Sequence, residues 1–420
     1  MNKKETKIVN LGCRLNIFEG EVIKLLTKKN DINNYTIINS CVVTKKAEKK
    51  VLNEIKKNKK KYPSKKIILT GCAAQIKPDK YLSMPEVDCV VGNNEKVDSN
   101  FWKEFNEKNK IEVKEIFENA SINNHMVEKF EGKARAYIEI QQGCNHRCTF
   151  CIIPFARGNN RSVPVGVIVN RIKLLVKNGY KEVVLTGVDI TDYGIDLPGS
   201  PNLFKLVKRI LNLIPDLKQL RLSSLDCAEI NEDFWPLLNE KRLMPHFHIS
   251  IQAGNDLILK RMKRRHTKKQ VIDFVKKVRD LRKDAVFGAD LIAGFPTEDD
   301  IMFKDSVDLV LECKLTHLHV FPYSERELTP ASRMPQVSKK IIAERAAQLR
   351  KLGNKNLDAY LSGQIGTVKK VLIEQNKNSF SVGKCQHFTK IQIANSIKEG
   401  EIVDCLIYKV DKNISYASLI

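Results

Sequence analysis

The chain has 420 residues, more than one compact core usually holds, and 42% of them are hydrophobic and 7% aromatic. This composition is that of a globular protein and excludes an intrinsically disordered chain. No apolar run reaches the roughly 18 to 20 residues that a membrane span needs, and the amino terminus MNKKETKIVNLGC lacks the apolar core of a signal peptide. We expect two or three domains, a cytoplasmic location and no membrane partner.

The net charge of +23 reflects 72 Lys and Arg against 49 Asp and Glu, and the basic residues are concentrated in two segments. Residues 45–66 contain eleven lysines and two glutamates, and seven of the ten residues in 260–269 are basic. Such segments attract polyanions, nucleic acid above all, through the release of counterions. The alternative is a solvated surface in a chain that is generally rich in Lys, Asn and Ile.

In the amino-terminal region, residues 1–125, short β-branched segments alternate with helical ones, which predicts an open α/β domain. The predicted strands KIVNLG, YTIINS and KKIILTG are each followed directly by a cysteine, namely Cys13, Cys41 and Cys72. One predicted helix begins after Thr44, a favourable N-cap residue, and ends before Pro63.

Eleven cysteines in a chain without an export signal favour metal binding or catalysis over disulfides. Ligands of parallel α/β sheets gather beyond the carboxyl ends of the strands, so we expect the three cysteines of residues 1–125 that follow strands to share a cluster. Three independent buried thiols are the alternative. Cys89, Cys385 and Cys405 are expected to be structural, because an isolated cysteine is most often a small buried hydrophobic residue.

In residues 134–352, six predicted strands alternate with helical segments, at 136–140, 182–187, 219–224, 246–251, 286–294 and 316–321. This alternation predicts a parallel partial (β/α)6 barrel with its chemistry at the carboxyl ends of the strands. Residues 353–420 change to short alternating segments separated by Gly, Asn and Lys, which predicts a small β-barrel.

The segment GCNHRCTFC follows the first barrel strand and places Cys144, Cys148 and Cys151 on one loop. A 4Fe-4S cluster is fully ligated by four cysteines, so three leave one iron open to a substrate. The competing interpretations are a zinc site completed by His146 and an electron-transfer ferredoxin. His146 lies between the first two cysteines and is poorly placed to complete a tetrahedron, which favours the open cluster.

The spacing C-x3-C-x-aromatic-C, with Phe150 as the aromatic residue, resembles the signature of radical S-adenosylmethionine (SAM) enzymes. The whole chain is similar to the methylthiotransferases of that class. This resemblance rests on ordered motifs: LGCRLN, NSCVVTKKAEKK, TGCAAQ, GCNHRCTFCIIPFARG, LTGVDITDYG, RLSSLD, HFHISIQAGND, LKRMKRRHT, DLIAGFP and HVFPYSERELTPASRM. The carboxyl-terminal region resembles the family's RNA-binding TRAM domain.

The resemblance implies two 4Fe-4S clusters and SAM as cofactors. Cys144, Cys148 and Cys151 would hold the radical-generating cluster as catalytic residues and metal ligands. Cys13, Cys41 and Cys72 would hold an auxiliary cluster that handles sulfur. The family uses SAM twice, once to methylate sulfur and once to form the radical that takes hydrogen from the substrate carbon. Both cysteine sets should then face one shared cavity.

The nucleoside part of SAM is expected to contact residues at the active rim of the barrel. The candidates are Phe150, Gly187, Gln252, Asp290 and Gly294, although a glycine there can simply permit a turn. In addition, Arg157 and either Arg264 or Arg265 could bind carboxylate or phosphate through a forked guanidinium group. A plain surface role is the alternative for each arginine.

The second and last motifs resemble the branch that adds a methylthio group to carbon-2 of N6-threonylcarbamoyladenosine at tRNA position 37. We therefore expect a tRNA anticodon stem-loop, a reducing electron donor and a sulfur source as partners of a monomeric enzyme. The alternatives are N6-isopentenyladenosine in tRNA, a ribosomal protein aspartate, and, more remotely, a noncatalytic iron-sulfur or zinc protein that binds RNA. The chain departs from the family pattern at Ala253, Asn255, His266, Thr297 and Leu328.

Overall fold

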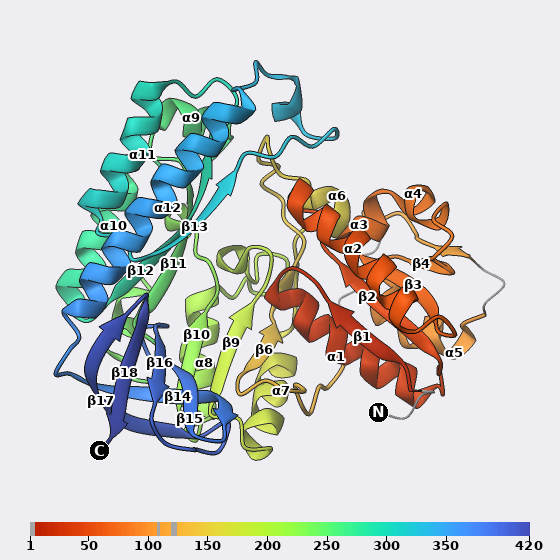
Figure 1. Cartoon of the computed structure of the whole chain (residues 1–420), viewed down its shortest axis with the longest axis horizontal. Helices are drawn as coiled ribbons and strands as arrows, with labels where there is room; N and C mark the ends of the chain where they lie inside the picture. Colours follow the sequence, from red (N-terminus) through yellow and green to blue (C-terminus); the bar gives the residue numbers. More distant parts are fainter. Residues whose placement is uncertain (1–4, 107–109, 119–123) are drawn as a thin grey trace.

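The computed structural model describes residues 5–106, 110–118 and 124–420, so three short parts of the predicted region 1–125 lie outside the described residues. Figure 1 shows an α/β unit formed by the amino-terminal part, a larger α/β unit in the middle, and a small β-barrel packed beneath the middle unit. None of the helices in the described ranges is both long and apolar enough to cross a membrane.

The amino-terminal unit is built on a five-stranded parallel sheet in the order β1-β2-β3-β4-β5. Its strands are β1 (Lys7–Asn10), β2 (Tyr35–Ser40), β3 (Lys66–Gly71), β4 (Cys89–Val91) and β5 (Ile111–Glu112). Its helices are α1 (Arg14–Lys29), α2 (Lys45–Lys61), α3 (Cys72–Ile76), α4 (Pro78–Leu82), η1 (Glu95–Val97) and α5 (Ser99–Glu104). The predicted open α/β sheet is confirmed.

Helix α2 illustrates why these segments fold as they do. The hydroxyl oxygen of Thr44 accepts a hydrogen bond from the backbone N–H of Ala47 at 3.1 Å, which satisfies one of the free donors at the helix start. The helix ends at Lys61, two residues before Pro63. Val51 and Ile55 face the sheet and are buried, while most of the lysines are exposed. Both predicted helix ends are confirmed.

The central unit contains six parallel strands arranged as two three-stranded sheets, β10-β9-β6 and β11-β12-β13. An isolated bridge between Leu225 and Ile249 joins the two sheets, so together they form an open, partial barrel. The strands are β6 (Ala136–Glu139), β9 (Glu182–Thr186), β10 (Gln219–Leu222), β11 (His246–Gln252), β12 (Val286–Ala293) and β13 (His317–Pro322). All six predicted strands are confirmed.

Helices cover the outside of this partial barrel (Figure 1). They are α7 (Val165–Lys177), α8 (Leu203–Leu213), α9 (Asp256–Arg261), α10 (Lys268–Leu281), α11 (Asp300–Glu312) and α12 (Lys339–Ser362), with the 3₁₀ turns η2 (Ile190–Asp192), η3 (Cys227–Glu229), η4 (Trp235–Asn239) and η5 (Pro330–Arg333). The main core is continuous with the amino-terminal unit, because Phe18 and Val22 of α1 join Ala136 and Ile138 of β6 in one buried cluster. This packing brings the ends of β1 and β2 close to the barrel.

The carboxyl-terminal part forms a closed barrel in the order β14-β15-β16-β18-β17, as predicted. Its strands are β14 (Val368–Lys377), β15 (Phe380–Cys385), β16 (Lys390–Ile393), β17 (Ile402–Asp411) and β18 (Ile414–Leu419). The sequence boundary between 352 and 353 falls inside α12, which continues along the central unit before this barrel begins. Cys385 and Cys405 are both buried in the barrel core.

The turn between β15 and β16 inserts into the end of the central barrel opposite the predicted active rim. Arg221 of β10 donates hydrogen bonds to the backbone carbonyls of Cys385 and Gln386, at 3.3 and 3.0 Å. The ring of Phe388 stacks on His246 of β11 with their centroids 5.3 Å apart. Four cationic side chains surround the same ring: Arg14, Arg135, Arg221 and Lys384. Nothing in the sequence pattern predicted this junction.

Candidate functional site

The loop that carries Cys144, Cys148 and Cys151 leaves the barrel just after β6. A two-stranded antiparallel ladder of β7 (Gln141–Gln142) and β8 (Arg161–Ser162) closes the base of this loop. Inside it, the short helix α6 (Ile153–Arg157) follows the last cysteine. The ladder fixes both ends of the loop, so the three thiols are held at the carboxyl rim of the barrel.

Gly143 allows the first cysteine of this loop to take its position. Its backbone φ is +66°, and a Cβ atom there would lie 1.9 Å from the carbonyl oxygen of Asn159. No other residue fits such a close approach of two backbone segments. The glycine of the GCNHRCTFC motif is therefore a geometric requirement of the loop.

The thiols of this loop are close enough for the charge of one to change the pKa of another, but their three sulfurs do not all lie within 4.8 Å of one another. Burial first, and then nearby negative charges including Cys148, raise the pKa values of Cys144 and Cys151 to about 12. Among the described residues, the groups whose metal-binding atoms all lie within 4.8 Å include neither cysteine triplet. Sulfurs around a single zinc ion lie only about 4 Å apart, so the wider spacing fits an iron-sulfur cube better.

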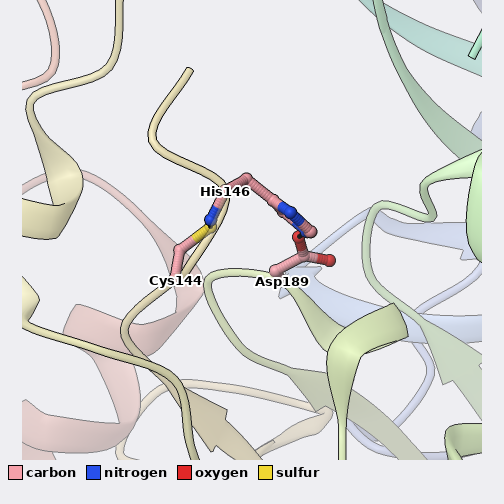
Figure 2. Close-up of side chains that lie close together, drawn as sticks. All are labelled: Cys144, His146 and Asp189. Atoms are coloured by element: carbon pink, nitrogen blue, oxygen red, sulfur yellow. Dashed lines mark hydrogen bonds and ion pairs between the residues drawn. The ribbon is translucent and has the colours of Figure 1, made fainter. Parts of the chain in front are cut away.

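His146 does not complete a zinc site with the three cysteines. Its Nε2 atom lies 2.7 Å from Asp189 Oδ2 and 3.1 Å from Glu229 Oε1, and it contacts Arg265 Nη2 at 2.8 Å. Figure 2 shows the imidazole directed to Asp189, while the backbone N–H of His146 faces the sulfur of Cys144 at 3.5 Å. The imidazole is therefore held by the carboxylates of Asp189 and Glu229, and within the described residues it shares a group of close metal-binding atoms with Cys144 and not with all three cysteines.

Arg264 is a cationic side chain that contacts one of the sulfurs of this loop. Its Nη1 lies 3.6 Å from Cys148 Sγ, and its Nη2 donates to Asp226 Oδ2 at 2.8 Å. The buried ring of His266 lies 3.4 Å from the other oxygen of Asp226 and 3.0 Å from the carbonyl of Ile251. Arg264 is thus held in place against Cys148, which rules out the plain surface role that was its alternative.

The second cysteine set lies at the ends of three adjacent parallel strands. Cys13 follows β1, Cys41 follows β2 and Cys72 follows β3, as their positions in the sequence predicted. Gly12 has a φ of +96°, and a Cβ there would lie 2.7 Å from the Cβ of Cys41. The first two cysteine loops therefore pack directly on one another.

The three thiols of this second set also influence one another. Burial first, and then the charges of Cys72 and Cys13, raise the pKa of Cys41 to about 11. All three are free cysteines in this structure. Sulfur is a soft metal ligand, and these three sulfurs are spaced more widely than the ligands of a single metal ion. Their spacing therefore also fits an iron-sulfur cube.

A cavity of about 380 Å³ lies between the two cysteine sets. Cys13 lines it from the amino-terminal unit, and Cys151 lines it from the barrel loop. Four of the predicted SAM-contact residues also line this cavity: Phe150, Gly187, Gln252 and Asp290. The structure thus brings one member of each cysteine set to a shared space, as the sequence analysis expected.

Gly294, the fifth predicted contact, takes a different position. Its φ is +72°, a Cβ there would lie 2.5 Å from the side chain of Ile342 on α12, and its N–H donates to Glu298. It permits the close approach of α12 and is not among the described residues that line the cavity. A direct contact with SAM at this position stays a prediction without support from the geometry.

Asp290 is held between two histidines that the sequence analysis did not single out. His248 Nε2 and His319 Nδ1 lie 2.9 and 3.2 Å from its Oδ1 atom. Burial alone would raise the pKa of Asp290, but these two imidazoles hold it below its usual range. Its carboxylate is therefore ionised in the cavity and can accept hydrogen bonds. The neighbouring strands β11 and β13 each carry an H-x-H pattern, which could have indicated that histidines lie beside Asp290.

Two of the departures from the family pattern, Asn255 and Thr297, have local explanations. Asn255 caps α9 by accepting from the N–H of Ile258, a role that serine would also fill. Thr297 has a φ of +68°, a conformation that favours glycine, and its hydroxyl accepts from Arg261 Nη1 at 2.8 Å. Ala253 is buried, and Leu328 is exposed. None of these changes removes a cysteine.

The segment 260–269, predicted as a basic surface, is surface only in part. Arg261 and Arg264 make the internal contacts described above, and Lys268 is paired with Asp305 at 3.1 Å. Lys260, Lys263 and Lys269 remain exposed. This stretch therefore helps to build the site in addition to presenting charge.

The barrel, its rim cysteines and the adjacent cavity define a radical SAM enzyme. Residues 138–310 match the model of the radical SAM superfamily, and residues 5–92 match that of an uncharacterized protein family, UPF0004. A solved structure of the radical SAM methyltransferase TsrM from Kitasatospora setae has a TM-score of 0.54, with 13% identity over 76% of this chain and 68% of that one, which shows the fold alone. Enzymes of this class use a 4Fe-4S cluster and SAM, which are therefore cofactors of this chain.

More specific relatives match nearly the entire chain. The threonylcarbamoyladenosine tRNA methylthiotransferase MtaB of Rickettsia prowazekii is 48% identical, with 96% of this chain and 94% of the relative covered. The tRNA-2-methylthio-N(6)-dimethylallyladenosine synthase of Thermodesulfovibrio yellowstonii is 30% identical, with 98% of each chain covered. The chain belongs to the methylthiotransferase family of radical SAM enzymes.

Proposed function

We propose that this enzyme adds a methylthio group to carbon-2 of N6-threonylcarbamoyladenosine in tRNA. The observation that carries the proposal is the cavity lined by both Cys13 and Cys151, together with 48% identity to a relative that bears this activity in its name. The lower identity to a dimethylallyladenosine enzyme supports the isopentenyl alternative less well.

In this proposal Cys144, Cys148 and Cys151 hold the cluster that supplies an electron for SAM cleavage and so yields the radical. Arg264 holds its positive charge against Cys148, where it stabilises added negative charge. Phe150, Gly187 and Gln252 shape the space for the SAM nucleoside beside this loop. The ionised carboxylate of Asp290 faces the same space and can accept hydrogen bonds from ribose hydroxyl groups.

We further propose that Cys13, Cys41 and Cys72 hold an auxiliary 4Fe-4S cluster as the sulfur-handling site. Two features of these thiols at the ends of β1, β2 and β3 support this assignment. Their charges affect the pKa of Cys41, and their sulfurs are spaced more widely than around a single metal ion. Since Cys13 lines the cavity, a sulfur held there would be presented to the substrate carbon from the side opposite Cys151. An external sulfur source and a reducing electron donor complete the set of partners.

The division into a methylthiotransferase domain, a radical SAM core and a TRAM-like domain, at 1–125, 134–352 and 353–420, is part of the proposal. Exposed lysines along α2 support binding of the tRNA anticodon stem-loop, because this helix begins at the cavity, where Thr44 is a lining residue. The closed barrel of residues 368–419 supports an RNA-binding role for the last domain. We also propose that the enzyme works in the cytoplasm as a monomer.

The deciding experiment is mass spectrometry of tRNA nucleosides from cells with and without the gene. The proposal expects a methylthio group on threonylcarbamoyladenosine that disappears with the gene and returns with the intact gene. Loss of the methylthio group from isopentenyladenosine instead would favour the alternative tRNA substrate. Unchanged tRNA nucleosides, together with loss of a methylthio group from a ribosomal protein in a parallel measurement, would favour the protein substrate. A protein that binds iron and RNA but changes no nucleoside would support the noncatalytic alternative.

A further inference from the structure

Arg157 is a buried arginine that belongs to one cysteine site and contacts the other. It ends α6, in the loop that carries Cys144, Cys148 and Cys151, and only 3% of its surface is exposed. Its guanidinium nevertheless lies against α1, the helix that begins directly after Cys13. A charge is retained in such a place only when it is fully paired.

The partners of this guanidinium come mainly from the amino-terminal unit. Its Nη1 donates to Glu19 Oε1 at 2.8 Å and to Gln142 Oε1 at 2.6 Å. Its Nη2 donates to Asn16 Oδ1 at 2.7 Å and to Glu19 Oε2 at 3.1 Å. The pairing with Glu19 is bidentate, which fixes the orientation of both side chains.

Asn16 connects this pair to two of the cysteine loops. Its Oδ1 atom lies 3.6 Å from Cys13 Sγ, within reach of a weak hydrogen bond from the thiol. Its Nδ2 donates to the carbonyl oxygen of Ser40, the residue before Cys41, at 3.1 Å. Arg157 is therefore one hydrogen-bonded residue away from both cysteine loops.

A second buried cation extends the network to the third cysteine. Lys96 Nζ donates to Glu19 Oε2 at 2.7 Å and to Asn93 Oδ1 at 2.6 Å. Asn93 Nδ2 in turn lies 3.9 Å from Cys72 Sγ. Glu19 and Lys96 are both completely buried, so this chain of contacts is shielded from water.

Arg157 and Lys96 are both hydrogen-bonded to the carboxylate of Glu19, so the network holds two cations on one carboxylate beside the cysteines. Arg157 also lines the cavity together with Cys13, which places its charge beside this cysteine set. Three thiolates around a cluster concentrate negative charge at a site that is buried only at Cys72, and a neighbouring cation stabilises this charge.

We propose that Arg157 is a positioning and charge-compensating residue of the auxiliary cluster, supplied to the Cys13, Cys41 and Cys72 site by the loop of the radical cluster. The inference rests on the proposed function, because it takes the auxiliary cluster as given. It goes further by making the auxiliary site incomplete until the amino-terminal unit and the barrel are packed together.

The test uses the full chain with Cys144, Cys148 and Cys151 replaced by alanine, so that an auxiliary cluster is the only one left. In this background Arg157→Gln should shift the cluster's reduction potential to a more negative value, because a neutral side chain no longer stabilises the reduced form. Iron should be lost to a chelator about 10- to 100-fold faster. Arg157→Lys keeps the charge, so it should restore the potential and only part of the resistance to the chelator.

Glu19→Gln provides a test in the opposite direction, because it removes the negative partner and leaves both cations. It should shift the potential to a more positive value, which a general packing defect would not do. Arg171→Gln is the matched control, because Arg171 is equally buried and lies over the ring of Phe18, away from the cysteines. It should lower stability and leave the potential unchanged.

Each result distinguishes the inference from the function on which it rests. If the parent chain with the three alanines binds no iron, both the auxiliary cluster and the role of Arg157 are contradicted. Iron binding with an unchanged potential in both Arg157→Gln and Glu19→Gln would overturn the role of Arg157 and leave the proposed function standing. If Arg157→Gln does not fold, the sign of the shift in Glu19→Gln decides.

Discussion

The two cysteine sites of this enzyme are built in opposite ways. One takes Cys144, Cys148 and Cys151 from a single loop whose ends are tied by the β7–β8 ladder. The other takes one cysteine from each of three loops that follow adjacent strands of a parallel sheet. The first depends on local backbone geometry, whereas the second depends on how β1, β2 and β3 align and on the contacts between their loops.

The largest expected effect separates the chemical roles of the two sites. Cys148→Ala should reduce formation of 5′-deoxyadenosine to background, because Cys148 is one of the three proposed ligands of the radical-generating cluster. Cys41→Ala should leave SAM cleavage intact and abolish transfer of the methylthio group to tRNA. Both products are measured by mass spectrometry after anaerobic reduction with SAM and tRNA. Methylthiolation by Cys41→Ala would contradict the division of roles.

The next prediction tests the dependence of the second site on loop packing. Gly12→Ala places a Cβ 2.7 Å from that of Cys41 at a φ of +96°, so it should destabilise the fold by about 2 kcal/mol or more and lower the iron bound there. Gly132→Ala is the control, because its φ of +62° is also positive but no atom lies within 4 Å. It should destabilise by about 1 kcal/mol and leave iron content unchanged. Equal iron contents would show that the close approach is unimportant.

A pH-dependent effect is expected from Glu139, which lies fully buried on β6 beside Glu19. Burial first, and then the charge of Glu19, raise the pKa of Glu139 from 4.5 to about 7. The folded protein therefore keeps a proton that the unfolded chain has released, and stability falls as pH rises from about 4.5 to 7. The loss approaches about 3 kcal/mol above this window.

Glu139→Gln should remove this part of the pH dependence, because the side chain stays neutral at every pH. Urea unfolding midpoints at pH 5.5 and 8 provide the measurement, with the unaltered protein as the control. The variant should gain about 3 kcal/mol of stability relative to that control at pH 8 but only about 1 kcal/mol at pH 5.5, where most of the loss has not yet occurred. An equal gap between the two proteins at both pH values would contradict the raised pKa.

The smallest expected effect concerns the helix that follows Cys41. Thr44→Ala removes the N-cap of α2 and should lower stability by about 1 kcal/mol. Thr267→Ala removes the capping box of α10, which belongs to the central unit and not to the unit that carries Cys13, Cys41 and Cys72, and it should have a similar effect on stability. Only Thr44→Ala should speed the loss of iron to a chelator from the second site. If both variants lose iron to the chelator at the same rate, the start of α2 does not contribute to holding iron at that site.

The contrast between the sites also explains what could be predicted from sequence. The spacing of Cys144, Cys148 and Cys151 is a local pattern, so it identified a loop site directly. Cys13, Cys41 and Cys72 could be assigned to one site only because each follows a predicted strand. Ligands bind beyond the carboxyl ends of the strands in parallel sheets, so three cysteines in that position are expected to lie together. The six barrel strands were predictable from local patterns, because each is a short, largely apolar run between helical segments.

Contacts that join distant segments were not predictable from the chain. Arg157 could be named as a candidate, but its pairing with Glu19 depends on how α1 packs on β6. The histidines around Asp290 come from separate strands, and their convergence requires the sheet register. Gly294 ends a strand at the expected rim, but packing against α12 directs it away from the cavity.

The turn that carries Phe388 limits how freely parts of this chain can be exchanged. Its ring fills the space among three arginines and a lysine, two of which belong to the central barrel and one to α1. Deleting the last barrel would remove both the ring and Lys384. Arg14, Arg135 and Arg221 would then lack the aromatic face that attracts all three, although Arg135 and Arg221 would keep their pairing with Glu182. A graft of a foreign RNA-binding module would therefore have to bring an equivalent ring on an equivalent turn.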